Sequence, residues 1–173
     1  PETGPTKVGF WMCDMTTGMN AAFAVASALF RRTQTGQGDY VDVSMLDTAV
    51  SLMSPLAALP INYDVDPPIT GNGVPGSGGP STVFSTADGT VTVSAVTPAQ
   101  FAAWAREVGR GDLAEDERFT TIEARIEHAD EFRRLMTEAF VNDTAENWGR
   151  RLNAVGIPAS KNKQVRELRD DAQ

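Results

Sequence analysis

A run of prolines and glycines between residues 60 and 81 restricts the fold of this chain more than any other feature. It reads PINYDVDPPITGNGVPGSGGPS and contains five prolines and five glycines. Because both residue types disfavour helices and central strands, we expect neither to cross it. Loops of this length inside a compact domain are uncommon and are either functional lids or linkers. We therefore predict structured parts at 1–59 and 82–173, joined by a glycine-rich loop at 60–81 whose role stays open.

The part before the loop is mainly helical in pattern. Alanine and apolar residues at helical spacing predict a helix over 16–32, and its many small side chains favour close packing. Alternating valines predict a short strand from Tyr40 to Val43. A second helix is predicted over 44–59, and Pro55 within it indicates a kink or an early end.

The part after the loop begins with a hairpin pattern. TVFST and TVTVSAV alternate as strands do, and the Asp88-Gly89 pair supplies a turn. The rest predicts helices over 97–109, 120–140 and 143–156, the short extended segment GIPASKNK, and a final helix from residue 165. We therefore expect an α+β fold, in which a helical linker precedes a small domain with a short antiparallel sheet and packed helices.

Two of these helices carry more detailed predictions. Helical spacing over 120–140 predicts one amphipathic helix with an inward set of apolar residues. This set comprises Ile122, Ile126, Phe132, Leu135, Met136 and Phe140. Asp143 is followed three residues later by Glu146, which predicts a capping box at the start of the next helix.

Composition excludes several classes of partner. A net charge of -8 and a pI near 4.6 argue against a nucleic-acid or anionic-membrane surface. The single cysteine, Cys13, excludes an intrachain disulfide and a cysteine metal cage, and it favours a reducing setting. PETGPTKVG resembles no targeting signal, and no apolar run approaches the roughly 20 residues of a membrane helix. We expect a soluble, cytoplasmic protein without nucleic-acid or membrane partners.

Familiar catalytic and cofactor motifs are scarce. His128 is the only histidine and lies in the charged stretch IEHADE, which disfavours a Ser-His-Asp or Cys-His site. The chain has no metal-ligand spacing, so we predict no metal site. GNGVPGSGGP lacks the G-K-[ST] ending and precedes a strand, so it is neither a phosphate loop nor a dinucleotide fingerprint.

Asp14 stands at the start of the first predicted helix, in CDMTTGMN, just before Thr16 and Thr17. The simpler interpretation is a helix cap that accepts backbone N–H bonds. The same position would keep a carboxylate ionised beside the positive end of the helix dipole, as covalent catalysis by aspartate requires. The residues alone leave both interpretations open.

The order of these motifs resembles the family III CoA-transferases, which include formyl-CoA transferase, carnitine CoA-transferase and the alpha-methylacyl-CoA racemases. The stretch CDMTTGMNAAFAVASALFRRTQTGQGDYVDVSMLDTAV matches the family's aspartate, small-residue helix, glycine turn, VDVS segment and following helix start. FSTADGTVTVSAVTPAQF, DERFTTIEAR and GIPASKNKQVRELRDDAQ follow in family order. Each motif alone is weak, but the ordered set covers nearly the whole chain.

The resemblance implies a mechanism. Asp14 matches the family's catalytic aspartate, which forms a mixed anhydride and then an aspartyl-CoA thioester. Met45 matches a methionine near the thioester. The glycine-rich loop that closes over the intermediate corresponds here to Gly76, Ser77, Gly78 and Gly79. The implied substrates are an acyl-CoA and a carboxylic acid acceptor, with coenzyme A as part of the substrate and no tightly bound cofactor.

Two alternatives accompany this interpretation. Racemases of the family pair the same aspartate with a histidine, which would lie upstream of Pro1. The glycine-rich loop, and Thr97 in VTPAQF where a glutamate would suit a racemase, favour the transferase. A non-catalytic interaction module with the same fold is the second alternative.

The resemblance also implies that family members have more chain than these 173 residues. The N-terminal half that binds the CoA nucleotide and the C-terminal end would be missing. Residues 1–59 would then be the catalytic-helix and linker segment, and 82–173 the small domain. We expect these residues to be inactive alone and the full-length protein to form an interlocked homodimer.

Overall fold

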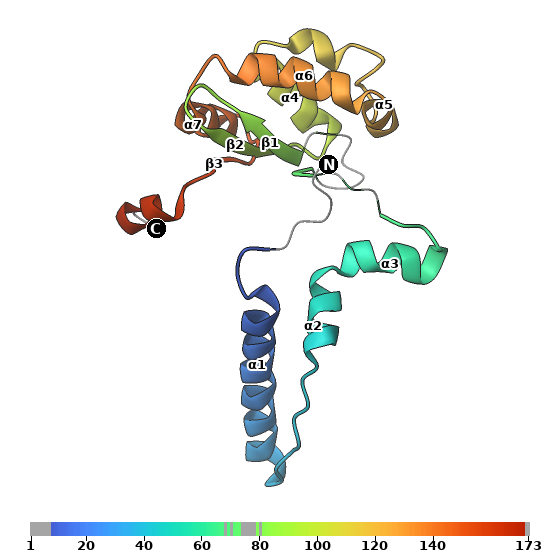
Figure 1. Cartoon of the computed structure of the whole chain (residues 1–173), viewed down its shortest axis with the longest axis vertical. Helices are drawn as coiled ribbons and strands as arrows, with labels where there is room; N and C mark the ends of the chain where they lie inside the picture. Colours follow the sequence, from blue (N-terminus) through green and yellow to red (C-terminus); the bar gives the residue numbers. More distant parts are fainter. Residues whose placement is uncertain (1–7, 68, 70, 74–78, 80, 172–173) are drawn as a thin grey trace. The chain divides into compact units, whose positions relative to one another are not determined.

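The computed structural model describes residues 8–67, 69, 71–73, 79 and 81–171. The chain forms two compact units, Pro1–Pro68 and Ile69–Gln173 (Figure 1). The regular secondary structure among the described residues of the first unit is all helical. The described residues of the second unit form a three-stranded antiparallel sheet with helices. The predicted α+β class is therefore confirmed.

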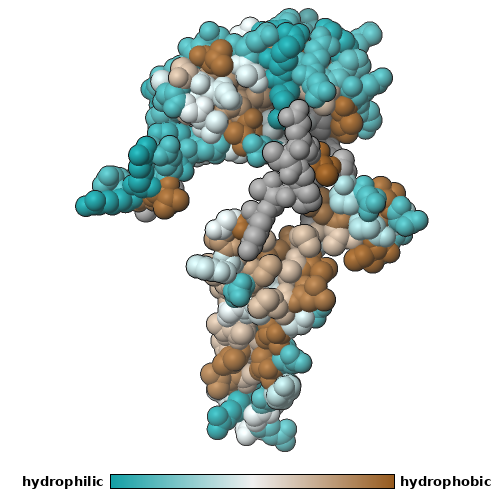
Figure 2. Space-filling model, in the orientation of Figure 1, coloured by the Kyte–Doolittle hydropathy of each residue, from teal (hydrophilic) through white to brown (hydrophobic). Residues whose placement is uncertain are grey.

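The first helix, α1, spans Met12–Thr35 and extends beyond both ends of the helix predicted over 16–32. It ends at Gly36, which has a left-handed φ of 70° and donates its N–H to the Arg32 carbonyl at 2.8 Å. α1 contains no buried residue, and Figure 2 shows apolar side chains along its surface. None of the helices in the described part of the chain is both long and apolar enough to cross a membrane.

Residues 37–44 connect α1 to the next helix without regular structure, so the strand predicted at Tyr40–Val43 is wrong. Alternating valines suit a strand, but cross-strand pairs are what stabilise a sheet. The described residues of this unit include no other strand to pair with. The segment therefore stays extended and irregular, with Tyr40 88% exposed.

The single helix predicted over 44–59 is two helices, α2 (Met45–Leu52) and α3 (Ser54–Tyr63). The predicted early end near Pro55 is confirmed, because α2 stops three residues before it. Pro55 lies in the first turn of α3, where its missing N–H and fixed φ are tolerated. α3 continues through Pro60, so residues 60–63 are helical although they were expected in the loop.

The sheet of the second unit has the order β1-β2-β3. β1 (Ser81–Ser85) and β2 (Thr90–Ser94) form the predicted hairpin, and β3 (Ala159–Lys161) lies in the segment predicted to be extended. The hairpin turn also contacts a helix, because the Asp88 carboxylate accepts the Ala145 N–H at 2.8 Å. The turn is thus held against the start of α7.

The helices of this unit are α4 (Pro98–Glu107), α5 (Ile122–Glu127), α6 (Ala129–Phe140) and α7 (Ala145–Ala154), with 3₁₀ helices η1 (Gly111–Ala114) and η2 (Val165–Asp170). α4 begins with a complete capping box. The Thr97 hydroxyl accepts the Gln100 N–H at 3.2 Å, and the Gln100 side chain accepts the Thr97 N–H at 3.1 Å. The final predicted helix is the short 3₁₀ helix η2, not an α-helix.

An aromatic cluster forms the core of the second unit. Its members are at most 3% exposed and comprise Phe84, Phe101, Trp104, Phe119, Phe132, Phe140 and Trp148. The Phe132 ring centroid lies 5.7–5.8 Å from the centroids of three others, in tilted or edge-on arrangements. Trp148 satisfies its indole N–H by donating to the Phe140 carbonyl at 2.7 Å. This unit therefore has a hydrophobic core of its own.

The helix predicted over 120–140 is interrupted at His128. Phe132, Met136 and Phe140 are fully buried as predicted, and Leu135 packs against the core. Ile122 and Ile126 are 37% and 52% exposed, so their prediction as inward residues is wrong. The physical reason is the interruption, because a break in the helix changes which face of α5 meets the core.

Arg125 is the residue that α5 buries, at 1% exposure. Its guanidinium donates to the Phe119 carbonyl at 2.5 Å and lies over the Phe101 ring, 4.5 Å from the centroid. Burial lowers the pKa of this guanidinium. The chain therefore stabilises a buried cation with an aromatic face and a carbonyl.

The capping box predicted at Asp143 and Glu146 is wrong. Thr144 is the N-cap of α7, and its hydroxyl accepts the Asn147 N–H at 3.3 Å. Asp143 instead accepts the Thr144 N–H at 2.7 Å and the Asn147 side-chain amide at 2.9 Å. Thr144 caps the helix in place of Asp143, so α7 starts one residue later than the sequence pattern predicts.

The outer edge of β3 is covered by Asn153 of α7. Its amide donates to the Ala159 carbonyl at 2.7 Å and its oxygen accepts the Ala159 N–H at 3.3 Å. The N–H and carbonyl of Ala159 point away from β2. Successive residues of a strand direct these groups to alternate sides, and the backbone groups of Pro158 and Asn162 are the ones that bond to β2. An unpaired edge can bind another strand, so Asn153 protects the sheet from edge pairing.

We expect Asn153→Ala to lower the free energy of unfolding by about 1–2 kcal/mol, since two bonds to Ala159 are lost. The exposed edge should also favour self-association at high concentration. Urea unfolding and light scattering of the 173-residue chain measure the two effects. Ser160→Ala is the control, because within the described part of the chain that hydroxyl bonds only the neighbouring Lys161 carbonyl, at 3.3 Å. Equal behaviour of the two variants would contradict the prediction.

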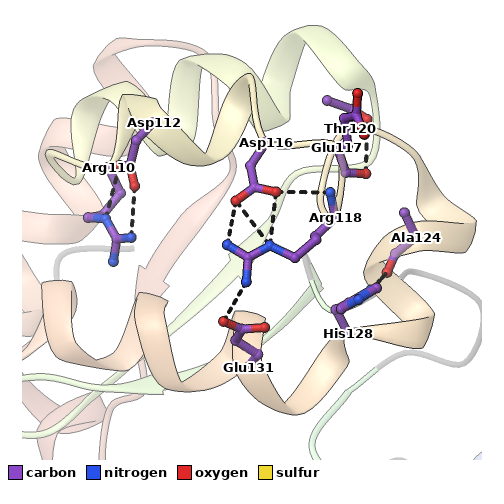
Figure 3. Close-up of polar contacts among 9 residues, drawn as sticks. All are labelled: Arg110, Asp112, Asp116, Glu117, Arg118, Thr120, Ala124, His128 and Glu131. Atoms are coloured by element: carbon purple, nitrogen blue, oxygen red, sulfur yellow. Dashed lines mark hydrogen bonds and ion pairs between the residues drawn. The ribbon is translucent and has the colours of Figure 1, made fainter.

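A surface ion-pair group joins the turn after η1 to α6 (Figure 3). Arg118 contacts both oxygens of Asp116 at 2.6–3.2 Å and reaches Glu131 at 2.7 Å. The Arg118 guanidinium lowers the pKa of Asp116 to about 2. Because the carboxylate is favoured in the folded state, it stabilises the fold above its unfolded pKa of about 3.9.

This contribution should disappear as pH falls from about 4 to about 2, where Asp116 becomes protonated in the folded state. Asp116→Asn should therefore be less stable than the native chain at pH 7, and the difference should shrink towards pH 2. Urea unfolding at a series of pH values measures this. A difference between the two proteins that does not change with pH would contradict the assignment.

Candidate functional site

Asp14 is the third residue of α1 and lies in its first turn. Its side chain is exposed, and within the described part of the chain it has no hydrogen bond or ion pair. The hydroxyls of Thr16 and Thr17 donate back to the carbonyls of Met12 and Cys13, at 2.8 and 2.6 Å, so neither engages Asp14. Asp14 is thus an exposed carboxylate in the first turn of a 24-residue helix, and neither neighbouring threonine hydroxyl bonds to it.

The predicted capping role of Asp14 is wrong. The first residue of α1 is Met12, two residues before Asp14. The N-cap of the helix is Trp11, which makes no side-chain capping bond. Met12 and Cys13 adopt helical backbone, so the helix extends past the aspartate towards the N-terminus. Asp14 therefore makes no capping contact, and its carboxylate is available for other interactions.

Met45 is the first residue of α2 and is 49% exposed. Helices α1 and α2 run in opposite directions (Figure 1). A hydrogen bond from Asn20 to Thr48 joins them. Asp14 and Met45 lie on opposite sides of this bond along the helix axes, roughly 13 Å apart at 1.5 Å of rise per residue. The first unit by itself therefore does not bring Met45 beside Asp14.

Gly79 is the one predicted loop residue within the described part of the chain; Gly76, Ser77 and Gly78 lie outside it. Gly79 has a φ of 92°, a backbone angle that residues other than glycine rarely adopt. A Cβ atom at this position would lie 2.9 Å from Cδ1 of Phe132. The glycine thus rests directly against the aromatic core of the second unit, which leaves no room for a side chain.

His128 has a structural position. Its Nδ1 lies 3.0 Å from the Ala124 carbonyl (Figure 3). Its ring meets the Phe119 ring edge-on, with the centroids 6.3 Å apart. It ends α5 and precedes α6. Across the described residues, no group of three or more histidine, cysteine or acidic side chains gathers as metal ligands.

Sequence reasoning missed the contact between Asn20 and Thr48. Asn20 Nδ2 donates to Thr48 Oγ1 at 3.2 Å, and Thr48 is 4% exposed. Asparagine is unfavourable within helices because its side chain competes for backbone groups. An asparagine inside an alanine-rich helix was therefore a usable signal for a specific contact.

Comparison with known proteins gives a consistent result. A family model described as CoA-transferase family III matches residues 1–173. A succinyl-CoA–D-citramalate CoA-transferase of Chloroflexus aurantiacus is 31% identical over 175 residues, which covers 99% of this chain and 42% of that protein. The probable fatty acyl-CoA transferase Rv3272 of Mycobacterium tuberculosis is 32% identical over 168 residues, covering 92% and 43%.

Solved structures agree with these sequence matches. The crystal structure of Rv3272 superposes with a TM-score of 0.83 at 30% identity, over 99% of this chain and 44% of that one. A CAIB/BAIF family protein from Brucella suis gives a TM-score of 0.77 at 28% identity, over 98% and 44%. This chain thus spans about two fifths of the length of the relatives that it matches.

Proposed function

Because this chain belongs to CoA-transferase family III, we propose that the full-length protein transfers coenzyme A from an acyl-CoA to a carboxylic acid. Asp14 is the nucleophile in this proposal. The observation that carries it is the exposed Asp14 carboxylate in the first turn of α1, which no cation engages within the described residues. A carboxylate can form covalent intermediates that divide one difficult acyl transfer into easier steps.

The steps balance without another reactant. An oxygen of Asp14 attacks the thioester carbonyl, the C–S bond breaks, and CoA leaves as a thiolate, giving a mixed anhydride. The thiolate attacks the aspartyl carbonyl and releases the donor acid, which leaves an aspartyl-CoA thioester. The acceptor carboxylate attacks this thioester and forms a new anhydride with release of the thiolate. Attack of the thiolate on the acceptor carbonyl gives the new acyl-CoA and restores Asp14.

The mixed anhydride must be kept from water, and this requirement gives the other predicted residues their proposed roles. An anhydride open to solvent would hydrolyse, so a covering segment favours transfer. We assign this covering role to the glycine-rich segment of Gly76, Ser77, Gly78 and Gly79. We also propose that Met45 lies near the thioester once the rest of the full-length dimer completes the site, because the first unit alone does not bring it beside Asp14. Gly79, the last residue of that segment, lies in close contact with Phe132. In the proposal 1–59 carries the nucleophile, 60–81 the loop and 82–173 the small domain.

Assembly and location complete the proposal. We assign the full-length protein to the cytoplasm as a homodimer, without a tightly bound cofactor. The apolar surface of α1 supports an assembly, because Met15, Met19, Phe23 and Phe30 are 61–76% exposed. The 173 residues alone should transfer no CoA, since a nucleotide-binding part would be needed.

Trapping the intermediate tests the chemistry. The full-length protein is incubated with acyl-CoA and then with hydroxylamine, which converts an activated aspartyl group into a hydroxamate. Mass spectrometry of the peptide that contains Asp14 should show this modification only when acyl-CoA is present. Modification of a different residue would overturn the assignment of the nucleophile. Exchange of the acyl-CoA alpha proton in heavy water without CoA transfer would instead indicate a racemase.

A further inference from the structure

One polar contact joins the two packed helices of the first unit. Asn20 Nδ2, in α1, donates to Thr48 Oγ1, in α2, at 3.2 Å. The Thr48 hydroxyl donates in turn to the Ser44 carbonyl at 2.9 Å. Thr48 is 4% exposed and is the only buried residue among those described in this unit. Among the described residues of the unit, the one well-buried position is therefore occupied by a hydroxyl that is hydrogen-bonded on both sides.

Apolar packing between these two helices is limited within the first unit. α1 has no buried residue, so within this unit only a small apolar area holds it against α2. Non-directional contacts between small side chains allow helices to slide or rotate at little cost. A hydrogen bond is directional, and a single asparagine can fix the register of paired helices. The bond from Asn20 to Thr48 has this character.

The contact is linked to the start of α2. The Ser44 hydroxyl accepts the Asp47 N–H at 3.1 Å and caps the helix, while the Ser44 carbonyl receives the Thr48 hydroxyl. Asn20 is therefore tied to the first turn of α2, where Met45 lies. The bonded groups come from both helices, so a shift of α1 along α2 breaks the connection.

Asp14 lies on the same helix as Asn20, six residues towards the N-terminus. At 1.5 Å of rise per residue the two are about 9 Å apart along the axis. A continuous helix moves as a rigid rod over this length, so the register at Asn20 also determines where the Asp14 carboxylate lies. Displacement of a reacting group by about 1 Å can cost about 100-fold in rate.

We propose that Asn20 is a positioning residue, which through Thr48 sets the register of α1 against α2 and thereby places the Asp14 carboxylate for attack on the thioester. The inference rests on the proposed function of Asp14. Asn20 touches no reacting atom in this scheme and acts only through the position of its helix. Loss of the bond should therefore slow the chemical steps and leave substrate affinity nearly unchanged.

The test uses the full-length protein with Asn20→Ala, Thr48→Val and the double variant. We expect each single variant to lower kcat by about 10- to 100-fold, with the KM for acyl-CoA changed less than about threefold. The burst of CoA release on mixing with acyl-CoA should slow by the same factor as kcat. The double variant should be no slower than the single variants, because both remove one interaction.

Two variants serve as matched controls. Thr48→Ser keeps the hydroxyl and should retain nearly the native kcat. Asn62→Ala removes an asparagine of α3 whose amide, as far as the described residues go, bonds only the Ala58 carbonyl of its own helix, at 2.9 Å, and it should also be nearly native. These controls separate the contact between α1 and α2 from a general effect of asparagine or threonine substitution.

Three results would overturn the inference. The first is a native kcat in Asn20→Ala while Asp14→Asn is inactive. This result would contradict the positioning role of Asn20 but agree with the proposed function of Asp14. The second is a rise in KM with kcat unchanged. The third is loss of folded structure, by circular dichroism, in both Asn20→Ala and Thr48→Val, which would assign the contact to stability. Full activity in Asp14→Asn would instead reject the proposed nucleophile itself.

Discussion

Asp14→Asn should reduce the rate of CoA transfer by the full-length protein at least about 10³-fold. An asparagine side chain has nearly the same size and shape, but its amide cannot form the anhydride or the thioester. The binding surfaces for acyl-CoA are unchanged, so KM should stay within about threefold of the native value. Chromatographic measurement of acyl-CoA formed from donor and acceptor gives both constants.

The chain offers a matched control for this substitution. Asp47 is also an acidic residue in the first turn of a helix, α2, in the same unit. Asp47→Asn therefore repeats the change of charge and helix position away from the proposed nucleophile, and its transfer rate should stay within about threefold of native. If the two variants were equally slow, the loss would reflect charge or helix stability and not covalent catalysis.

Local signals in the sequence were sufficient for several elements. The Asp88-Gly89 pair between alternating strands predicted the hairpin, because this dipeptide favours the turn itself. Pro55 predicted the end of α2 for a similarly local reason. The strand at Tyr40–Val43 failed because a strand requires a partner, which local alternation does not supply. Elements that depend on distant contacts were therefore the ones predicted least well.

Helix phase shows the same limit. The apolar pattern over 120–140 predicts one helix, with Ile122 and Ile126 on the same face as Phe132. The interruption at His128 separates them, and Arg125 takes the buried position. In this position Arg125 contacts the Phe101 ring and the Phe119 carbonyl, which come near it only in the folded chain. Periodicity contains no information about such contacts.

For the candidate site, the sequence points to Asp14 but not to the contact between Asn20 and Thr48. Asp14 emerged from the order of motifs along the chain, which required no knowledge of contacts. The bond between Asn20 and Thr48 joins residues 28 positions apart and depends on how α1 packs on α2. A pairing of this kind cannot be read from either helix alone. Its donor could be suspected, since asparagine is unfavourable inside a helix, but its acceptor could not.

Phe132→Ala should lower the free energy of unfolding by about 3–5 kcal/mol, the largest stability effect expected among the substitutions considered. Phe132 is fully buried and contacts Phe101, Trp104 and Phe119, so truncation leaves a cavity at the centre of the aromatic cluster. Urea unfolding of the 173-residue chain, followed by tryptophan emission, measures the loss. As a control, Phe23→Ala removes a side chain that is 76% exposed and should cost less than about 0.5 kcal/mol.

The contact between Phe132 and Gly79 adds a sharper test. Gly79→Ala should lower the free energy of unfolding by about 2–4 kcal/mol, because it combines an unfavourable φ with a Cβ 2.9 Å from the ring. Gly71→Ala is the matched control, since its φ of 60° carries a similar penalty but no atom of the described residues lies within 4 Å of a Cβ at this position. In a Phe132→Leu background the excess cost of Gly79→Ala over Gly71→Ala should largely disappear. An excess that persists there would show that the ring is not what excludes a side chain, and that the backbone at Gly79 is restrained by other contacts.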